Sequence, residues 1–537
     1  MNTRSRSLLL GSALVLAGSN GCMRAAASEG PAASTSNTPQ LVVFITVDQL
    51  RGDMLDRYRA DMRHGYARLM QGAWFVNGFQ DHANTETAPG HASTMSGRFP
   101  RSTGIMSNSA GVGDRSFPLV VGVANELGAS PLRFQGTTLF DWLRAKDSRA
   151  RALSVSRKDR GAILPIGRAK EHVYWYSPSG NFTTSRYYRT ALPDWVQAFN
   201  ARRIPHSYAG KQWRLSRDPS SYPQPDTVPE ENGGRSHFPF QLSTDTARAT
   251  ANFMGIPAMD SLTALFALEG LERLNLGRGP HTDVLAVSFS TTDAVGHAYG
   301  PDSREAHENQ IRVDETLGWF IDSLYKIRDS STILFALTAD HGVQPIPDLA
   351  RRRGEATGNQ GLIVSLRDAV TAVRAGLRAA GGDTSAFIYD GELVGVNREL
   401  LARARLNADS LLDDFRTRAL AVPGVARVDR VADVYRADFN ADPIARRWSH
   451  QVTRDAGIDL VITLTRYSYW YRATATHGSP YDQDAHVPII FYGPWAQPGR
   501  YTEMARTADI GATLAVITGA RPLEPLDGVV LTSAIKR

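Results

Sequence analysis

"VLAVSFSTTDAVGH", residues 284–297, decides the fold, because an apolar run typical of a buried strand ends in a segment that carries Asp293 and His297. A second apolar run, TILFALT (332–338), ends in the same way at ADHG. Between the two runs, apolar residues recur at helical spacing, namely Val313, Leu317, Phe320 and Leu324. A strand, a helix and a strand in this order predict a βαβ unit with a right-handed crossover.

Two further runs extend this pattern towards both ends of the chain. LVVFITV (41–47) is an unbroken β-branched run followed by Asp48, and VPIIFYG (487–493) is a fourth strand candidate. Unbroken apolar runs suit strands that are buried on both faces of a parallel sheet. We therefore expect an α/β fold: a mostly parallel central sheet flanked by helices, with long loop insertions and a small α+β insertion.

The rest of the chain divides around this sheet. Residues 28–40 are small and polar and predict a disordered leader, and residues 41–537 predict one catalytic domain. Insertions are expected at about 165–240, which we interpret as long loops over the sheet edge, and at about 350–475. Within the second, residues 385–436 alternate short strand patterns with a helix rich in Arg and Leu, which indicates the small α+β unit.

Residues 1–27 have the pattern of an export signal. Arg4 and Arg6 precede the apolar run SLLLGSALVLAG, which is too short to remain as a membrane span, and a small-residue cleavage site follows near Ala27. We therefore expect a periplasmic or secreted protein. Lipid anchoring through Cys22 has weak support, because the residue three positions earlier is Ser19 rather than an apolar one. No later run of about 18 apolar residues occurs, so no stable membrane span is expected.

Charge and cysteine content limit the function classes. The net charge of the 537 residues is +6, and three of these charges lie in the export signal, so about +3 remains, too little to argue for a nucleic-acid partner. Cys22, the only cysteine, also lies in the signal. Any metal in the mature protein must therefore be held by nitrogen and oxygen atoms.

Acids and histidines gather where the expected strands end. One Asp after a strand is usually a turn former or a helix cap, but strand ends in an open α/β sheet meet at one edge. Three carboxylates and three imidazoles at that edge predict a site for zinc, and they exceed what one tetrahedral ion needs. Two ions about 4 Å apart, which clamp the attacking and leaving oxygens of a phosphoryl transfer, are the natural interpretation. The six residues are Asp48, Asp293, His297, Asp340, His341 and His486.

The segment NTETAPGHASTMSG (84–97) holds two threonines at the expected start of a helix. Threonine caps helices by accepting a bond from a free backbone N–H, which is the plain interpretation of Thr85 and Thr87. A helix N-terminus also attracts anions, and a hydroxyl beside a divalent cation loses its proton near neutral pH. A threonine here is therefore a candidate phosphate acceptor.

Together these residues resemble the alkaline phosphatase superfamily, in particular the bacterial threonine-nucleophile alkaline phosphatases of the phosphate-irrepressible type. These are relatives of the nucleotide pyrophosphatase/phosphodiesterases. The likeness runs from FITVDQLRGD to AHVPIIFYG. It implies that Thr87, which begins a TxxGH segment, is the nucleophile rather than Thr85. It also implies two Zn²⁺ per chain, one held by Asp293, His297 and His486, the other by Asp48, Asp340, His341 and Thr87.

The same resemblance implies three phosphate-binding residues. Asn108 in GIMSNS stands at the spacing from Thr87 at which the family places a donor to a phosphoryl oxygen. SRKDRGAI (156–163) matches the Lys-x-Arg pair of monoester-specific members, here Lys158 and Arg160, although its composition alone favours a solvated basic turn. A monoester keeps two negative charges, which two cations suit, and the diesterase relatives lack the pair. The expected function is hydrolysis of phosphate monoesters through a phosphothreonine intermediate.

Three other histidines have no ligand role in this interpretation. His477 competes with His486, and His486 is preferred because the family's ligand abuts the last strand. His91 is expected to pack or bond at the helix start, and His82 stays unassigned.

Other functions are less well supported. A phosphodiesterase or nucleotide pyrophosphatase is the first alternative. The nucleophile segment lacks the C/S-x-P-x-R pattern of a sulfatase, and the export signal argues against a glycolytic mutase. A secreted binding protein with structural metals would need neither an accessible threonine nor a Lys-x-Arg pair. Nothing in the sequence specifies the oligomeric state.

Overall fold

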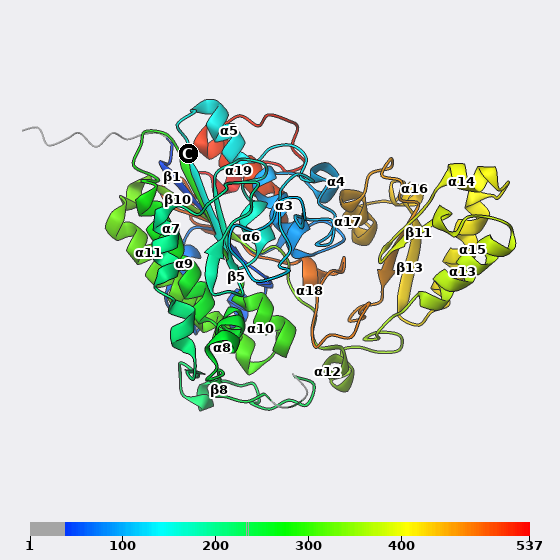
Figure 1. Cartoon of the computed structure of the whole chain (residues 1–537), viewed down its shortest axis with the longest axis horizontal. Coiled ribbons are helices and arrows are strands. Elements are labelled where there is room, and N and C mark those ends of the chain that lie inside the picture. Colours follow the sequence, from blue (N-terminus) through cyan, green and yellow to red (C-terminus); the bar gives the residue numbers. More distant parts are fainter. Residues whose placement is uncertain (1–37, 232–233, 235, 537) are drawn as a thin grey trace, which may run out of the picture. The chain divides into compact units, whose positions relative to one another are not determined.

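The computed structural model describes residues 38–231, 234 and 236–536 (Figure 1). The expected export signal and residues 28–37 of the expected leader lie outside this part of the chain. Within it, no single helix combines the length and apolar character of a membrane span. Two helical segments that meet at a bend, Thr246–Gly255 and Ala258–Arg273, together reach the length and apolar content of a span, by length and composition only.

A mixed, mostly parallel sheet of nine strands forms the centre, as predicted. Its order is β16-β2-β15-β10-β1-β9-β4-β5-β6. The five strands from β10 to β5 are parallel, whereas β15 and β6 pair antiparallel with their inner neighbours. The bounds are β1 Leu41–Val47, β2 Ala73–Phe75, β4 Ala152–Ser156, β5 His172–Ser177, β6 Asn181–Thr183, β9 Asp283–Phe289, β10 Ile333–Thr338, β15 Ile489–Tyr492 and β16 Gly499–Tyr501.

The expected βαβ unit is β9, α10, α11 and β10, and β1 lies between its two strands. Helices cover both faces of the sheet (Figure 1). Val43 and Ile45 of β1 pack in one core with α9 and α11, whereas Val42 and Phe44 pack in a second core with α5 and α19. This alternation explains why the run 41–47 is apolar at nearly every position. The bounds are α3 Thr87–Ser96, α5 Leu139–Lys146, α6 Asp159–Ile163, α9 Ala258–Arg273, α10 Thr291–Tyr299, α11 Arg304–Ile327 and α19 Ala508–Thr518.

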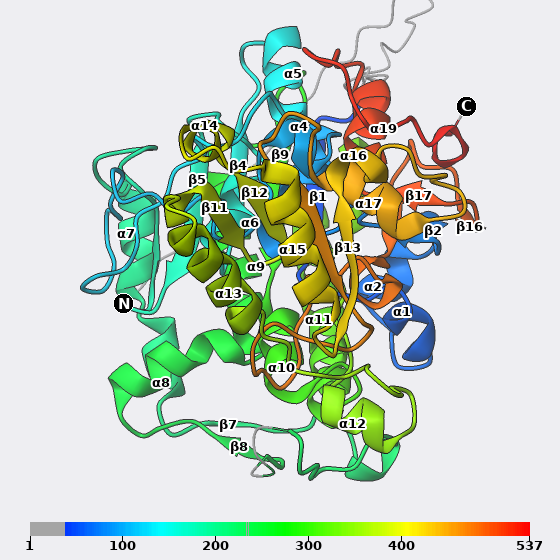
Figure 2. The same ribbon diagram turned by 90° about the vertical axis from the view of Figure 1, so that its right-hand side faces the viewer.

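The second insertion contains its own antiparallel sheet, β11-β12-β14-β13, which carries helices α13 and α15 (Figures 1 and 2). The small α+β unit is therefore present, although β14 extends it beyond residue 436. The bounds are β11 Phe387–Asp390, β12 Leu393–Val396, β13 Val425–Arg430, β14 Leu460–Leu464, α13 Arg367–Ala379, α15 Ala408–Leu420 and α17 Pro443–Gln451.

Residues 165–240 differ from the expected long loops. The segment HVYWYS forms β5, which pairs with β4, and β6 adds the edge strand. Aromatic side chains of both strands are buried in the main core, which accounts for the high aromatic content of this segment. Further along are α7 (Asp194–Ala201) and a two-stranded ribbon of β7 (Gln212–Trp213) and β8 (Phe240–Gln241).

A buried carboxylate ties the second insertion to the core. Asp81 follows β3 (Gly78–Phe79), is fully buried, and lies 3.1 Å from Arg446 and 3.5 Å from Arg447, both on α17. Arg506, near the C-terminus, lies 3.0 Å away. Burial alone would raise the pKa of Asp81, but His450 and Arg446 hold this pKa below its usual range.

We expect Asp81→Asn to lower the free energy of unfolding by about 3–5 kcal/mol, because it leaves buried guanidinium groups uncompensated. Since the folded pKa is below 3.8, the carboxylate stabilises the fold above about pH 4, and this stabilisation is lost as the pH falls further. Denaturant midpoints at pH 7 and pH 4 test both points. Asp322→Asn, which removes a half-exposed partner of Arg68, is the control, and an equal loss in both variants would contradict the prediction.

Candidate metal centre and active site

Three strand ends place three aspartates at one edge of the central sheet. Asp48 follows β1 and Asp340 follows β10, separated from it only by Ala339. Asp293 lies in the first turn of α10, which begins two residues after β9 ends, and His297 is one helical turn further on. The i,i+4 spacing puts both side chains on one face of the helix, and His297 Nε2 lies 3.2 Å from Asp293 Oδ1.

Two groups of side chains are arranged to hold a metal ion, and they share Asp293. In each group the ligand atoms lie within 4.8 Å of one another. Asp340 adjoins the second group, with its Oδ2 3.6 Å from His341 Nε2. The predicted bimetallic arrangement is thus matched by two adjacent candidate triads. The first is Asp293, His297 and His477, and the second is Asp48, Asp293 and His341.

His477, not His486, completes the first group, so the preference stated from sequence does not match the geometry. His477 Nε2 lies 3.7 Å from Asp293 Oδ1, and its ring stacks on His341 at 3.5 Å between centroids. The loop that carries His477 leaves β14 of the small sheet and crosses the strand ends, where His477 Nδ1 bonds to the carbonyl of Thr85 at 2.8 Å.

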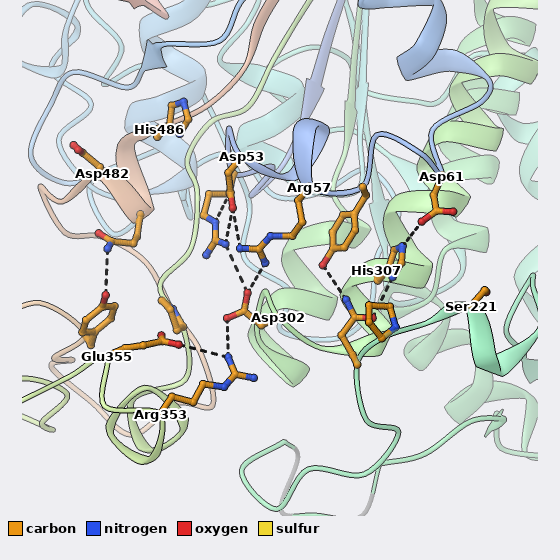
Figure 3. A pocket seen from close by; sticks show the side chains of 17 residues that line it. Asp53, Arg57, Asp61, Ser221, Asp302, His307, Arg353, Glu355, Asp482 and His486 are labelled. Carbon is orange, nitrogen blue, oxygen red and sulfur yellow. Dashed lines mark hydrogen bonds and ion pairs between the residues drawn. The ribbon is translucent and has the colours of Figure 1, made fainter.

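His486 points elsewhere. The short helix α18 (Asp482–Ala485) ends just before it, and the backbone of His486 then pairs with Phe79. Its Nε2 lies 2.7 Å from the carbonyl oxygen of Val76. His486 lines a cavity of about 760 Å³, and no residue of either metal group lines it. Asp53 and Asp302 line the same cavity (Figure 3). Proximity to the last strand was therefore a misleading guide.

Thr87 begins α3, as expected for a residue at a helix N-terminus. Its Oγ1 lies 3.4 Å from His341 Nε2 and 3.3 Å from Lys158 Nζ, and the N-cap position is held by Glu86 rather than by a threonine. Thr87 as a residue is only 1% exposed, so the open access that the small residues of the segment suggest is not found. Thr85 instead donates to the carbonyl of Ser479 at 2.8 Å. The two threonines thus differ in their contacts: Thr87 lies beside His341 and Lys158, whereas Thr85 bonds to the loop of Ser479.

Lys158 is the cation closest to the aspartates. Its ammonium lies 2.7 Å from Asp48 Oδ2 and 2.7 Å from Asp293 Oδ2, and its side chain is 9% exposed. It occupies the N-cap position of α6, which brings it to the strand ends. Lys158 is therefore not part of a solvated basic turn. Its buried ammonium instead pairs with two of the expected metal ligands.

Asn108 and Lys158 lie close to Thr87. Asn108 Oδ1 accepts the backbone N–H of Ala88 at 2.9 Å, which places the amide at the start of α3. Lys158 Nζ lies 3.3 Å from Thr87 Oγ1. Arg160 lies on α6, two residues after Lys158, and its guanidinium contacts Asp159.

The chemistry of the donor set fits divalent cations. Asp48 Oδ1 is buried without a hydrogen-bond partner, and the ammonium of Lys158 is shared between Asp48 and Asp293, so these buried carboxylates leave negative charge that further cations would balance. Burial, and then the charge of Asp340, raises the pKa of Asp48 to about 6. Burial, and then the charges of His341 and His297, lowers the pKa of His477 well below its usual range, so the neutral imidazole that binds metals is favoured.

Two residues next to the aspartates were not recognised from the sequence as parts of the site. Gln49 follows Asp48, and its side-chain amide donates to Asp293 Oδ1 at 3.2 Å. Arg157 precedes Lys158, and its Nη2 lies 3.4 Å from Asp293 Oδ2. Their position beside expected site residues was the only available indication, because polar residues that orient ligands carry no motif of their own.

His91 bonds at the start of α3, as expected. Its Nδ1 lies 3.0 Å from the carbonyl oxygen of Thr87 and 3.2 Å from Asp340 Oδ2, and its Nε2 lies 3.1 Å from Ser288 Oγ. His91 therefore also orients one of the expected ligands. His82 is fully buried, and neither of its ring nitrogens has a hydrogen-bond partner in the described part of the chain.

Known proteins share both the sequence pattern and the fold. The sequence profile of the type I phosphodiesterase/nucleotide pyrophosphatase family matches residues 42–383. Alkaline phosphatase PhoV of Synechococcus elongatus is 29% identical over 524 residues, covering 93% of each chain. Alkaline phosphatase PhoK of a Sphingomonas species is 29% identical, covering 91% of this chain and 90% of its own. The crystal structure of wild-type alkaline phosphatase PafA superposes with a TM-score of 0.84 at 26% identity, covering 93% of this chain and 99% of its own.

Proposed function

The chain belongs to the type I phosphodiesterase/nucleotide pyrophosphatase family, since the family profile spans well over half of it, and from this premise we propose that it is an alkaline phosphatase. The relatives that match over most of its length are alkaline phosphatases. The proposed reaction is hydrolysis of phosphate monoesters at a two-metal site through a phosphothreonine intermediate.

The observation that carries the proposal is the position of the Thr87 hydroxyl. It lies at the N-terminus of α3, 3.4 Å from His341 of the second candidate metal group and 3.3 Å from Lys158. A structural metal site closes its coordination sphere and needs no neighbouring hydroxyl or ammonium. The conjunction of a hydroxyl, two metal groups and a cation therefore supports phosphoryl transfer over a binding role.

Two divalent cations, which we propose to be zinc, would supply the charge that activates the hydroxyl and stabilises the leaving oxygen. We propose Asp293, His297 and His477 as ligands of one, and Asp48, Asp340, His341 and Thr87 as ligands of the other. Carboxylate and neutral imidazole donors suit zinc, and no thiolate is present among the described residues.

The chain's own residues bind and orient the phosphate. Thr87 Oγ attacks phosphorus in line with the leaving alkoxide, and water then hydrolyses the phosphothreonine. The ammonium of Lys158, which lies 2.7 Å from both Asp48 and Asp293, would pair with a phosphate oxygen if cations balanced these two carboxylates. Arg160 and Asn108 hold the remaining oxygens, Arg160 through a bidentate fork.

A phosphodiesterase is the second candidate, and the family description itself favours it. A phosphatase and a phosphodiesterase differ in the charge of their substrates. Only a phosphate monoester carries two negative charges for Lys158 and Arg160 to balance. We expect p-nitrophenyl phosphate to be hydrolysed faster than bis-p-nitrophenyl phosphate. A clear preference for the diester would reverse the assignment.

Replacing Lys158 and Arg160 together by alanine is expected to lower kcat/KM for the monoester by about 100-fold or more, and for the diester by much less, because each charged contact contributes roughly 1.5–3 kcal/mol. Both rates are measured with the two p-nitrophenyl substrates. Lys211→Ala, which removes an exposed lysine beside Tyr208, is the control. Equal losses on both substrates would contradict a role in recognising the dianion.

We also propose that the protein is exported. This proposal depends on the sequence of residues 1–27, and fractionation of cells into periplasm, medium and cytoplasm tests it.

A further inference from the structure

Gln49 has a backbone conformation that glutamine rarely adopts. It follows Asp48 at the end of β1, is fully buried, and has φ of +69°, in the left-handed region. Side chains with a Cβ are disfavoured there, and such residues persist where the surrounding structure holds them for a purpose. Glycine would adopt this conformation without strain. The presence of glutamine therefore indicates that its side chain has a role.

The contacts of Gln49 reach one carboxylate of each proposed metal site. Its backbone N–H donates to Asp340 Oδ1 at 3.0 Å, and its side-chain Nε2 donates to Asp293 Oδ1 at 3.2 Å. The left-handed backbone turns the N–H towards one aspartate while the side chain extends towards the other. Both bonds are buried, so water does not compete for the donors.

A glycine on the neighbouring helix makes room for the side chain. A Cβ at Gly296, in the interior of α10, would lie 1.7 Å from Gln49 Oε1. Glycine weakens a helix interior, so its occurrence between Asp293 and His297 needs a reason, and the space taken by the Gln49 amide provides one. The helix that carries two proposed ligands is thus shaped to accept Gln49.

We infer that Gln49 is a positioning residue that orients Asp340 through its backbone and Asp293 through its side chain, with Gly296 providing the space. This inference rests on the proposed two-metal site. Groups that hydrogen-bond to metal ligands fix the ligand's orientation, and their loss typically lowers metal affinity by about 10–100-fold. The side chain acts on the ion held by Asp293, His297 and His477, while the backbone bond acts on the other.

Gln49→Gly separates the two bonds, because glycine keeps the left-handed backbone and its N–H but lacks the amide. Zinc affinity is measured by titrating Zn²⁺ into the apo-protein against a competing chelating dye. We expect one of the two zinc affinities to fall by about 10–100-fold and the other to stay within about 3-fold. The thermal unfolding temperature of the apo-protein should change little, which a merely structural role would not allow.

Gly296→Ala should reproduce this loss, because the added methyl group displaces the Gln49 amide. In the double variant the amide is absent and the methyl group fills its space, so no further loss is expected and the two single effects should not add. Gly376→Ala is the matched control. It places the same substitution in the interior of α13, where a Cβ meets nothing within 4 Å, and should leave both zinc affinities unchanged.

Additive losses in the double variant would overturn the inference, as would unchanged zinc affinities in Gln49→Gly. A different result would contradict the proposed function: the unaltered protein would bind fewer than two zinc ions or would not hydrolyse phosphate monoesters. Two tightly bound zinc ions and phosphatase activity in the unaltered protein, with no change in either zinc affinity on Gln49→Gly, would remove the inference alone.

Discussion

Thr87→Ala is expected to lower the rate of p-nitrophenyl phosphate hydrolysis by on the order of 10⁴-fold or more, because removing a nucleophile eliminates the covalent route. Zinc content, measured by elemental analysis, should remain near two ions per chain, since the proposed carboxylate and imidazole ligands are intact. Thr87→Ser keeps a hydroxyl and should retain activity within about 10-fold. Acid quenching during turnover of a ³²P-labelled monoester should trap phosphothreonine in the unaltered protein.

Thr85→Ala is the matched control for Thr87. Thr85 lies two residues away, is equally buried, and donates to the carbonyl of Ser479 rather than facing the metal groups. Its backbone carbonyl, which His477 contacts, is unchanged by the substitution. We expect a modest loss of stability and activity within a few-fold of the unaltered protein. A large loss in Thr85→Ala with full activity in Thr87→Ala would show that the wrong hydroxyl has been assigned.

His477→Ala and His486→Ala are expected to differ strongly. His477→Ala removes a proposed ligand, so one of two zinc ions should be lost at limiting metal and phosphatase activity should fall by about 100-fold or more. His486→Ala removes a contact with Val76 and a ring that packs on Phe79 at 5.3 Å, so about 1 kcal/mol of stability should be lost while two zinc ions remain.

Elemental analysis and p-nitrophenyl phosphate turnover measure both variants, and each serves as the other's control. The two histidines are nine positions apart in the same segment between β14 and β15. The reverse result, with zinc lost only in His486→Ala, would restore the assignment made from sequence.

Four adjacent strands of the central sheet were predictable because they carry clear apolar runs. β1, β9, β10 and β15 are buried along most of their length, and burial on both faces leaves little room for polar residues. β5 was missed because HVYWYS is aromatic and lies in a region rich in Pro, Ser and Arg. Its partner β4 is far enough away in sequence that the pairing leaves no local pattern.

The site was predictable where a ligand follows a strand and unpredictable where it lies on a loop. Asp48, Asp293 and Asp340 are placed by the sheet itself, so their convergence follows from topology. His477 is placed by a loop that returns from the small sheet, and the path of that loop depends on how the insertion packs. Sequence alone offered two histidines and no physical means of choosing between them.

Gln49 illustrates a second limit of the sequence. A glutamine after a strand has no distinguishing composition, and its importance appears only in its dihedral angle and in the facing Gly296. Both the dihedral angle and the facing glycine are features of the folded structure, not of the local sequence. Groups that orient ligands are therefore the part of a site least visible in one sequence.

The order of strands also constrains how the molecule is made. Of the described strands, β2 pairs with β15 and β16, so Ala73–Phe75 leave the ribosome long before Ile489–Tyr492 and Gly499–Tyr501 exist. At roughly 5–20 residues per second, translation leaves this segment without its partners for on the order of half a minute. Once β10 has been made, its outer edge also stays without a partner until β15 is synthesised. The nascent chain therefore carries unpaired strand edges until synthesis is almost finished, and such edges are the part of a sheet most prone to pair with other chains.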